Sequence, residues 1–76
     1  MSIAAISKAT VERILSEDPV TFNEARYFFP TRPDLSTLHR WRVKGAGGVK
    51  LAAIRCGGVW MTSRDECVRF IQARSR

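Results

Sequence analysis

Histidine, cysteine and long apolar runs are all scarce in this chain of 76 residues. His39 is the only histidine, and Cys56 and Cys67 are the only cysteines, so these residue types cannot supply the four ligands of a structural zinc site. We therefore expect no bound metal and no cofactor. We interpret both cysteines as small buried apolar side chains in a reducing cytoplasm, rather than as a disulfide pair.

Membrane-spanning, secretory and catalytic signatures are missing as well. No apolar run approaches the length that crosses a bilayer, and Lys8, Glu12 and Arg13 interrupt the N-terminal segment too soon for a signal peptide. No nucleophile, carboxylate or histidine stands in a recognisable catalytic motif. The sequence thus predicts a small cytoplasmic protein with no catalytic residues, no enzymatic activity and no membrane contact.

Acidic residues are absent from one long stretch of the chain. The net charge is +6, and residues 35–64 contain no Asp or Glu, whereas residues 1–25 contain more acids than bases. The cations of the acid-free stretch are Arg40, Arg42, Lys44, Lys50, Arg55 and Arg64. Because a solvated surface usually mixes both signs, a stretch of one sign indicates a surface for a polyanion.

The local patterns divide the chain into an N-terminal arm, residues 1–18, and a main domain, residues 19–76. Apolar residues near helical spacing predict that the arm is helical. In the main domain, Thr21 and Glu24 have the spacing of a capping box, which predicts a helix that Pro30 ends.

A third helix is predicted over residues 36–44. Ser36 is the expected N-cap, and Gly45 stands where a left-handed residue commonly ends a helix. Leu38 and Trp41 fall on one side of this helix and are expected to face the core. The basic residues then lie on the opposite side and on the flanks.

A β-hairpin is predicted over residues 50–62. Gly57-Gly58 can form its two-residue turn. This turn would pair Cys56 with Val59, Arg55 with Trp60, and Ile54 with Met61. Since side chains alternate faces, the first and third pairs are expected to pack inward and the Arg55–Trp60 pair to face outward.

A final helix follows a second capping-box pattern, Ser63-x-x-Glu66, with Cys67, Phe70 and Ile71 as its apolar stripe. The elements together predict an α+β fold, mainly α, in which helices pack with a two-stranded hairpin. Helix, turn, helix and basic hairpin in this order are the layout of a winged helix-turn-helix.

This layout predicts how the chain would bind double-stranded DNA. The major groove admits one α-helix, whose side chains meet base edges, while lysine and arginine bind phosphates. The residues expected to contact bases are Ser36, Thr37, His39 and Arg40. Those expected to contact the DNA backbone, or the minor groove beside the hairpin, are Arg42, Lys44, Lys50, Arg55, Trp60 and Arg64.

Three quoted segments, VTFNEARYF, STLHRWRVKG and IRCGGVWMTSRDECVRFI, resemble the excisionase/MerR-type winged helix-turn-helix. A group of short, largely uncharacterised bacterial proteins with STL-x-RW and GG…TSR segments is also similar. The resemblance covers about residues 20–72. It implies DNA binding in transcription regulation or DNA recombination, with residues 36–44 as the recognition helix and the hairpin as the wing.

A protein–protein interaction module that reuses the winged-helix fold is the alternative. In that case the acidic, apolar N-terminal arm would dock on a protein partner or on a second copy in a homodimer. An outward Trp60 could also anchor a protein partner. RNA binding is less favoured, because few exposed aromatic residues are expected for stacking on single-stranded bases.

Overall fold

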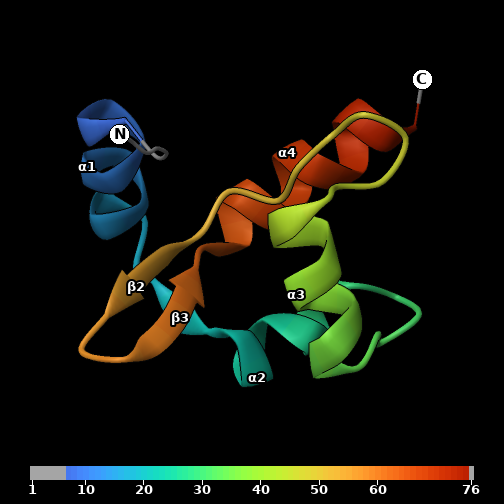
Figure 1. The fold of residues 1–76 in the computed structure, drawn as a ribbon, viewed down its shortest axis with the longest axis horizontal. Helices are drawn as coiled ribbons and strands as arrows, with labels where there is room; N and C mark the ends of the chain where they lie inside the picture. Colours follow the sequence, from blue (N-terminus) through green and yellow to red (C-terminus); the bar gives the residue numbers. More distant parts are fainter. Residues whose placement is uncertain (1–6, 76) are drawn as a thin grey trace.

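The chain adopts an α+β fold in which three antiparallel strands pack with four α-helices and a short 3₁₀ helix (Figure 1). The structure, a computed structural model, describes residues 7–75. In chain order the elements are α1 (Lys8–Ser16), β1 (Val20–Thr21), α2 (Phe22–Ala25), η1 (Arg26–Phe28), α3 (Leu35–Val43), β2 (Ile54–Cys56), β3 (Val59–Thr62) and α4 (Arg64–Arg74). About half of the chain is helical, so the predicted α+β class is confirmed.

The N-terminal arm is helical over α1, as the sequence predicts, and residues 1–6 of the predicted arm lie outside the described residues. Ser7 caps α1 by accepting a hydrogen bond from the backbone N–H of Thr10. Ile14 is the one residue of α1 that is fully buried, which anchors the helix to the rest of the molecule.

The sheet has one strand more than the sequence predicts. The hairpin register is confirmed, because Ile54 pairs with Met61 and Arg55 with Trp60 around a turn in which both glycines have positive φ. In addition, β1 pairs antiparallel with β3, so β3 is the central strand and β2 is an edge. Two residues are too few for a visible alternation of polarity, which is why β1 escaped the sequence analysis.

The predicted sidedness of the hairpin is wrong at its tip. Ile54 is buried and Met61 half-buried, but Cys56 and Val59 are exposed. The strands extend beyond the core, so alternation near the turn no longer separates core from solvent. Cys56 is therefore a free exposed thiol, whereas Cys67 is buried as predicted.

The capping box of α2 is confirmed, since Thr21 and Glu24 exchange both hydrogen bonds. The helix itself is shorter than predicted: it is α-helical over four residues and then tightens into η1 before Pro30. Tightening of the last turn is common where a helix must end. Phe22 and Phe29 are buried along this segment.

Helix α3 begins earlier than predicted because Asp34, not Ser36, is its N-cap. The Asp34 carboxylate accepts a 3.0 Å hydrogen bond from the backbone N–H of Thr37. The predicted end is confirmed, since Gly45 has φ +81° immediately after the cap residue Lys44.

The core lies between α2, η1, α3 and α4. The prediction that Leu38 and Trp41 face it is confirmed: Leu38 is fully buried, and the half-buried Trp41 ring lies 4.9 Å from Phe70 and 5.3 Å from Phe29, centroid to centroid. In α4, only half of the predicted capping box is present. Ser63 accepts from the N–H of Glu66, but the Glu66 side chain instead binds two arginines.

Candidate nucleic-acid interface

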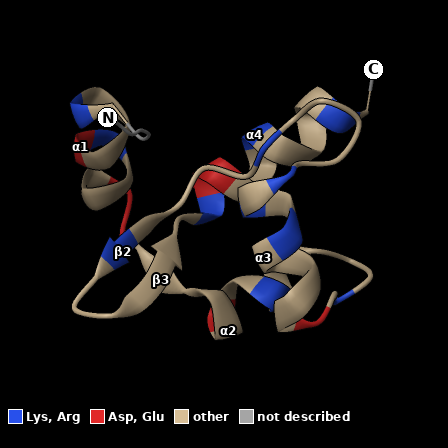
Figure 2. Cartoon of the chain, viewed as in Figure 1, with Lys and Arg blue, Asp and Glu red and all other residues tan. Residues whose placement is uncertain are grey.

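Opposite charges meet on one side of the molecule and are separated elsewhere. Figure 2 shows acidic residues on α1 and at the start of α4, whereas α3 carries basic residues along its length. Within residues 7–75, two of the ion pairs shorter than 4.0 Å join α1, or the residue that follows it, to α4, and the third lies within α4. The cations of the acid-free stretch form none of these pairs, so their charges are open to an external anion.

The paired charges form one network that docks α1 on α4. Glu66, whose side chain is 5% exposed, accepts from Arg13 at 2.7 Å and from Arg69 at 2.9 Å. Arg69 also binds Glu17 at 2.8 Å, and the Ser63 hydroxyl donates to Glu17. The hydrogen bonds from Arg69 and then Ser63 lower the pKa of Glu17 below its ordinary value of 4.5. This network holds the Glu17 and Glu66 carboxylates between α1 and α4, on elements other than α3.

Two of the predicted base-reading residues form hydrogen bonds with Asp34 at the start of α3. The hydroxyls of Ser36 and Thr37 donate to one Asp34 oxygen at 3.0 and 2.7 Å. Together with the Thr37 backbone N–H, these bonds lower the pKa of Asp34, with the Thr37 hydroxyl contributing most. The role of Asp34 was not predicted from the sequence. This residue immediately precedes the acid-free stretch, and it accepts hydrogen bonds from the Ser36 and Thr37 hydroxyls at the N-terminus of α3.

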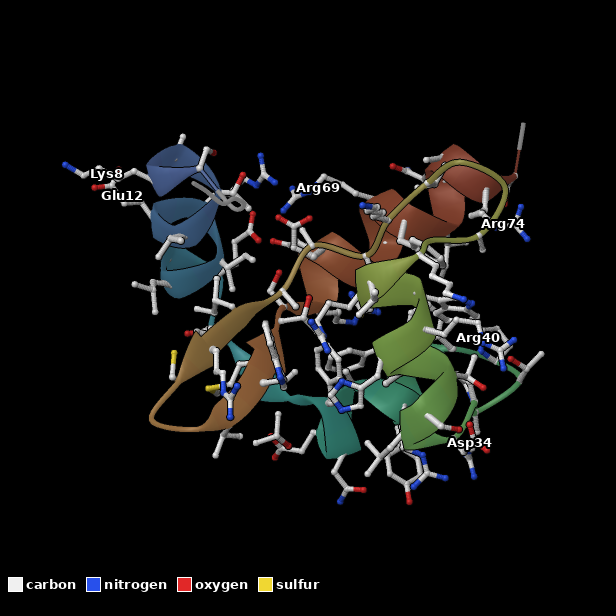
Figure 3. The ribbon with its side chains drawn as sticks, viewed as in Figure 1. Lys8, Glu12, Asp34, Arg40, Arg69 and Arg74 are labelled. Carbon is white, nitrogen blue, oxygen red and sulfur yellow. The ribbon has the colours of Figure 1, made fainter. Side chains whose placement is uncertain are left out.

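The other two base-reading candidates lie differently. Arg40 is exposed and projects from α3 away from the hairpin (Figure 3). His39 is half-buried, and its ring lies 4.9 Å from that of Phe22. Lys44, a predicted backbone contact one helical turn after Arg40, is also exposed.

Arg42 and Trp60 join α3 to the hairpin. The Arg42 guanidinium lies 3.8 Å above the Trp60 ring, and its Nε donates to His39 Nδ1 at 3.4 Å. Arg55 lies 5.8 Å from the same ring. The prediction that Trp60 faces outward is therefore wrong, because Trp60 is half-buried and packs against the core. A guanidinium held close to an aromatic ring by a cation–π contact can still donate its N–H groups to an anion.

A groove of about 590 Å³ opens beside this stack. Arg42, Lys50 and Trp60 line it together with Ser7 and Thr10 at the start of α1, and its remaining lining residues are Leu51 and Ala52. No carboxylate lines it. Lys50 and Arg42 come from segments eight residues apart, and the chain between them turns back on α3, where Leu51 N–H donates to Trp41 O. The groove thus brings three predicted backbone contacts together, Arg42, Lys50 and Trp60.

The remaining predicted contacts are spread more widely. Arg55 is exposed on β2, and Arg64 is exposed at the first residue of α4. The structure therefore brings Arg42, Lys50, Arg55 and Trp60 to one side of α3.

One basic and aromatic cluster was missed by sequence reasoning. Tyr27 is 60% exposed, and the guanidinium carbons of Arg26 and Arg32 lie 5.7 and 5.3 Å from its ring centroid. The spacing Arg-Tyr followed by a second arginine five residues later was visible in the sequence. However, all three residues precede the acid-free stretch. The sequence therefore indicated only structural roles for them, at the end of a helix and in the turn that follows it.

Neither cysteine supports a metal site. Among the described residues, no three His, Cys, Asp or Glu side chains are grouped closely enough to hold a metal ion. Burial raises the pKa of the Cys67 thiol to about 12, so this thiol stays protonated and unreactive at neutral pH. Over the same described stretch, no helix is both long and apolar enough to cross a membrane.

Comparison with known proteins gives one match. A family model with the description "Protein of unknown function (DUF1580)" matches residues 22–75. No curated protein and no solved structure shows a significant match. The matched span contains α2, η1, α3, the hairpin and α4, whereas α1 and β1 lie before it.

Proposed function

The chain belongs to the DUF1580 family, and we propose that it binds double-stranded DNA through a winged helix-turn-helix formed by residues 19–76. In this proposal α2 and η1 are the first helix of the motif, α3 is the recognition helix, and the β2–β3 hairpin is the wing. The biological role is that of a transcription regulator or a recombination accessory factor, without enzymatic activity.

One observation carries the proposal: within residues 7–75 the cations of α3 and the hairpin form no ion pair, while Glu17 and Glu66 are paired with Arg13 and Arg69 in a separate network. Unpaired cations on a protein surface repel one another, so their concentration is costly unless a polyanion neutralises them. Binding to DNA releases condensed counterions from each neutralised phosphate, which supplies the affinity.

In this proposal, base contacts and phosphate contacts come from two different sides of the recognition helix. Arg40, which is exposed and has no ion-pair partner among residues 7–75, is the best-placed side chain for a guanine edge. Arg42 and Lys50, which meet in the 590 Å³ groove, are suited to backbone phosphates because the Trp60 stack fixes Arg42 against the hairpin. Ser36 and Thr37 would reach bases only after exchanging their hydrogen bonds to Asp34.

A salt titration tests this function directly. Fluorescence anisotropy with a mixed-sequence duplex should give a plot of log K against log salt with a slope of about −4 to −5, if roughly four to six phosphates are neutralised. Selection of bound duplexes from a random library, at stated salt, would then reveal the preferred site. A flat salt response would rule the proposal out.

A second candidate function is protein–protein interaction through α1. An apolar groove of about 240 Å³ lies between α1 and β2, lined by Val11, Leu15 and Ile54 among others, and Leu15 is 52% exposed. Size-exclusion chromatography with light scattering discriminates the two functions. A dimer that becomes a monomer when residues 1–18 are removed would favour interaction. An unchanged oligomeric state would count against it.

A further inference from the structure

The Arg26–Tyr27–Arg32 cluster belongs to none of the contacts assigned so far. Its chemistry is unusual for a surface with no function. Tyr27 is 60% exposed, so its ring contributes little to the core, yet two guanidinium groups lie against it. Neither arginine has a carboxylate within 4.0 Å in the described part of the chain. Two like charges therefore converge on one exposed ring, and although Asp34 is close enough to attract Arg26 electrostatically, it forms no ion pair with either arginine.

The backbone holds the cluster in place. Arg26 Nε donates to the Pro33 carbonyl at 2.9 Å, which fixes the guanidinium beside the turn that precedes α3. Arg32 has φ +47°, a left-handed conformation that is uncommon for residues other than glycine. Such strain is retained where the surrounding structure imposes it, and it is frequent at binding sites. Here it belongs to a residue whose side chain returns to Tyr27.

The position of the cluster indicates its ligand. Arg32 and Pro33 immediately precede Asp34, the N-cap of α3, so the cluster lies at the N-terminal end of the proposed recognition helix. The Arg42–Lys50 groove lies at the other flank of that helix, toward the hairpin. A helix in the major groove is bordered by two phosphate strands about 12 Å apart. If α3 lies in that groove, each of the two cationic sites can face one of the strands.

We infer that Arg26, Tyr27 and Arg32 bind backbone phosphates of the DNA strand that runs past the N-terminal end of α3. This inference rests on the proposed function. The Tyr27 ring holds both guanidiniums by cation–π contact and leaves their N–H edges to the phosphate oxygens. The one carboxylate nearby, Asp34, is occupied by hydrogen bonds from Ser36 and Thr37 and so turns toward α3. The site reads no bases and is blind to sequence.

Arg32→Gln tests the inference with Lys8→Gln as its matched control. Both substitutions remove one exposed cation, but Lys8 lies on α1, on the far side of the molecule from Asp34 (Figure 3). Glutamine at position 32 keeps the same backbone conformation, and circular dichroism would verify the fold. Loss of one phosphate contact should make the slope of log K against log salt shallower by about 0.9 in Arg32→Gln and leave it unchanged in Lys8→Gln.

Substitutions of Tyr27 provide a second test. Tyr27→Phe keeps an aromatic face and should bind mixed-sequence DNA like the unaltered chain, whereas Tyr27→Ala should weaken binding to all sequences by a similar factor. If Arg32→Gln and Tyr27→Ala both bind as the unaltered chain does, the inference is overturned, the DNA-binding proposal stands, and the cluster is left to a protein contact. If the unaltered chain binds no duplex, both proposals fail together.

Discussion

Arg42 shows how much one side chain's position depends on residues far from it in sequence. The helix places it on the flank of α3, but the Trp60 ring 3.8 Å away and His39 Nδ1 determine where its guanidinium points. From the sequence, Arg42 was expected to contact the DNA backbone. The sequence could not show that the partner of Arg42 would be an aromatic ring, because that contact crosses from α3 to β3.

Asp34 is the clearest case of a single residue whose role the sequence did not predict, because the N-cap of α3 was expected at Ser36. The sequence indicates a helix start near Ser36, and serine is a good N-cap. The structure selects Asp34 because an ionised carboxylate accepts three hydrogen bonds at once, from the Thr37 backbone and from two hydroxyls. Both residues fit the local pattern, so only the geometry of the preceding turn decides between them.

At the residue scale we predict that Arg40→Ala and Lys50→Ala affect DNA binding differently. Arg40→Ala should cost about 1–3 kcal/mol on the selected duplex and little on random duplexes, because it removes a bidentate base contact. Lys50→Ala should weaken binding to every sequence and make the salt slope shallower by about 1, because it removes a phosphate contact. Anisotropy on selected and scrambled duplexes measures both, and identical behaviour of the two variants would contradict this division of roles.

At the scale of elements, the hairpin was the most predictable part of the fold and α1 the least. A Gly-Gly turn determines the register of its two strands through local chemistry, so the Arg55–Trp60 and Ile54–Met61 pairs follow from sequence alone. The placement of α1 depends on Ile14 and on side chains of α4 more than fifty residues away. No local pattern carries that information.

The ion-pair network between α1 and α4 gives the element-scale prediction. Either Arg13→Met or Arg69→Met alone should destabilise the protein by about 1–3 kcal/mol, because the buried Glu66 carboxylate keeps one guanidinium partner. The double variant should lose about 3–5 kcal/mol, because it leaves that carboxylate buried and unpaired. Urea unfolding measures these losses.

The matched control for this network is the triple variant with Glu66→Met added. It removes the orphaned charge and replaces it with an apolar side chain of similar length, so it should recover much of the stability lost in the double variant. A triple variant less stable than the double would show that Glu66 matters through something other than its charge, such as its place in the first turn of α4.

At the scale of the whole molecule, the separation of charges was predictable and its structural basis was not. The run of residues 35–64 without an acid is evident from the sequence, and it correctly indicates where unpaired cations gather. The sequence does not show that Arg13 and Arg69 are absorbed by Glu17 and Glu66. It also hides Arg26 and Arg32, which lie before the run and gather around Tyr27 at the N-terminal end of α3.

The docking of α1 on α4 has a consequence for the order in which the protein can be completed. During synthesis α1 leaves the ribosome before α4, so Arg13 and Glu17 lack their partners Glu66 and Arg69 until α4 has been translated. Closing such a long loop is slow compared with forming the hairpin. Helix α1, although it is made before α4, is therefore among the last elements to be fixed in place.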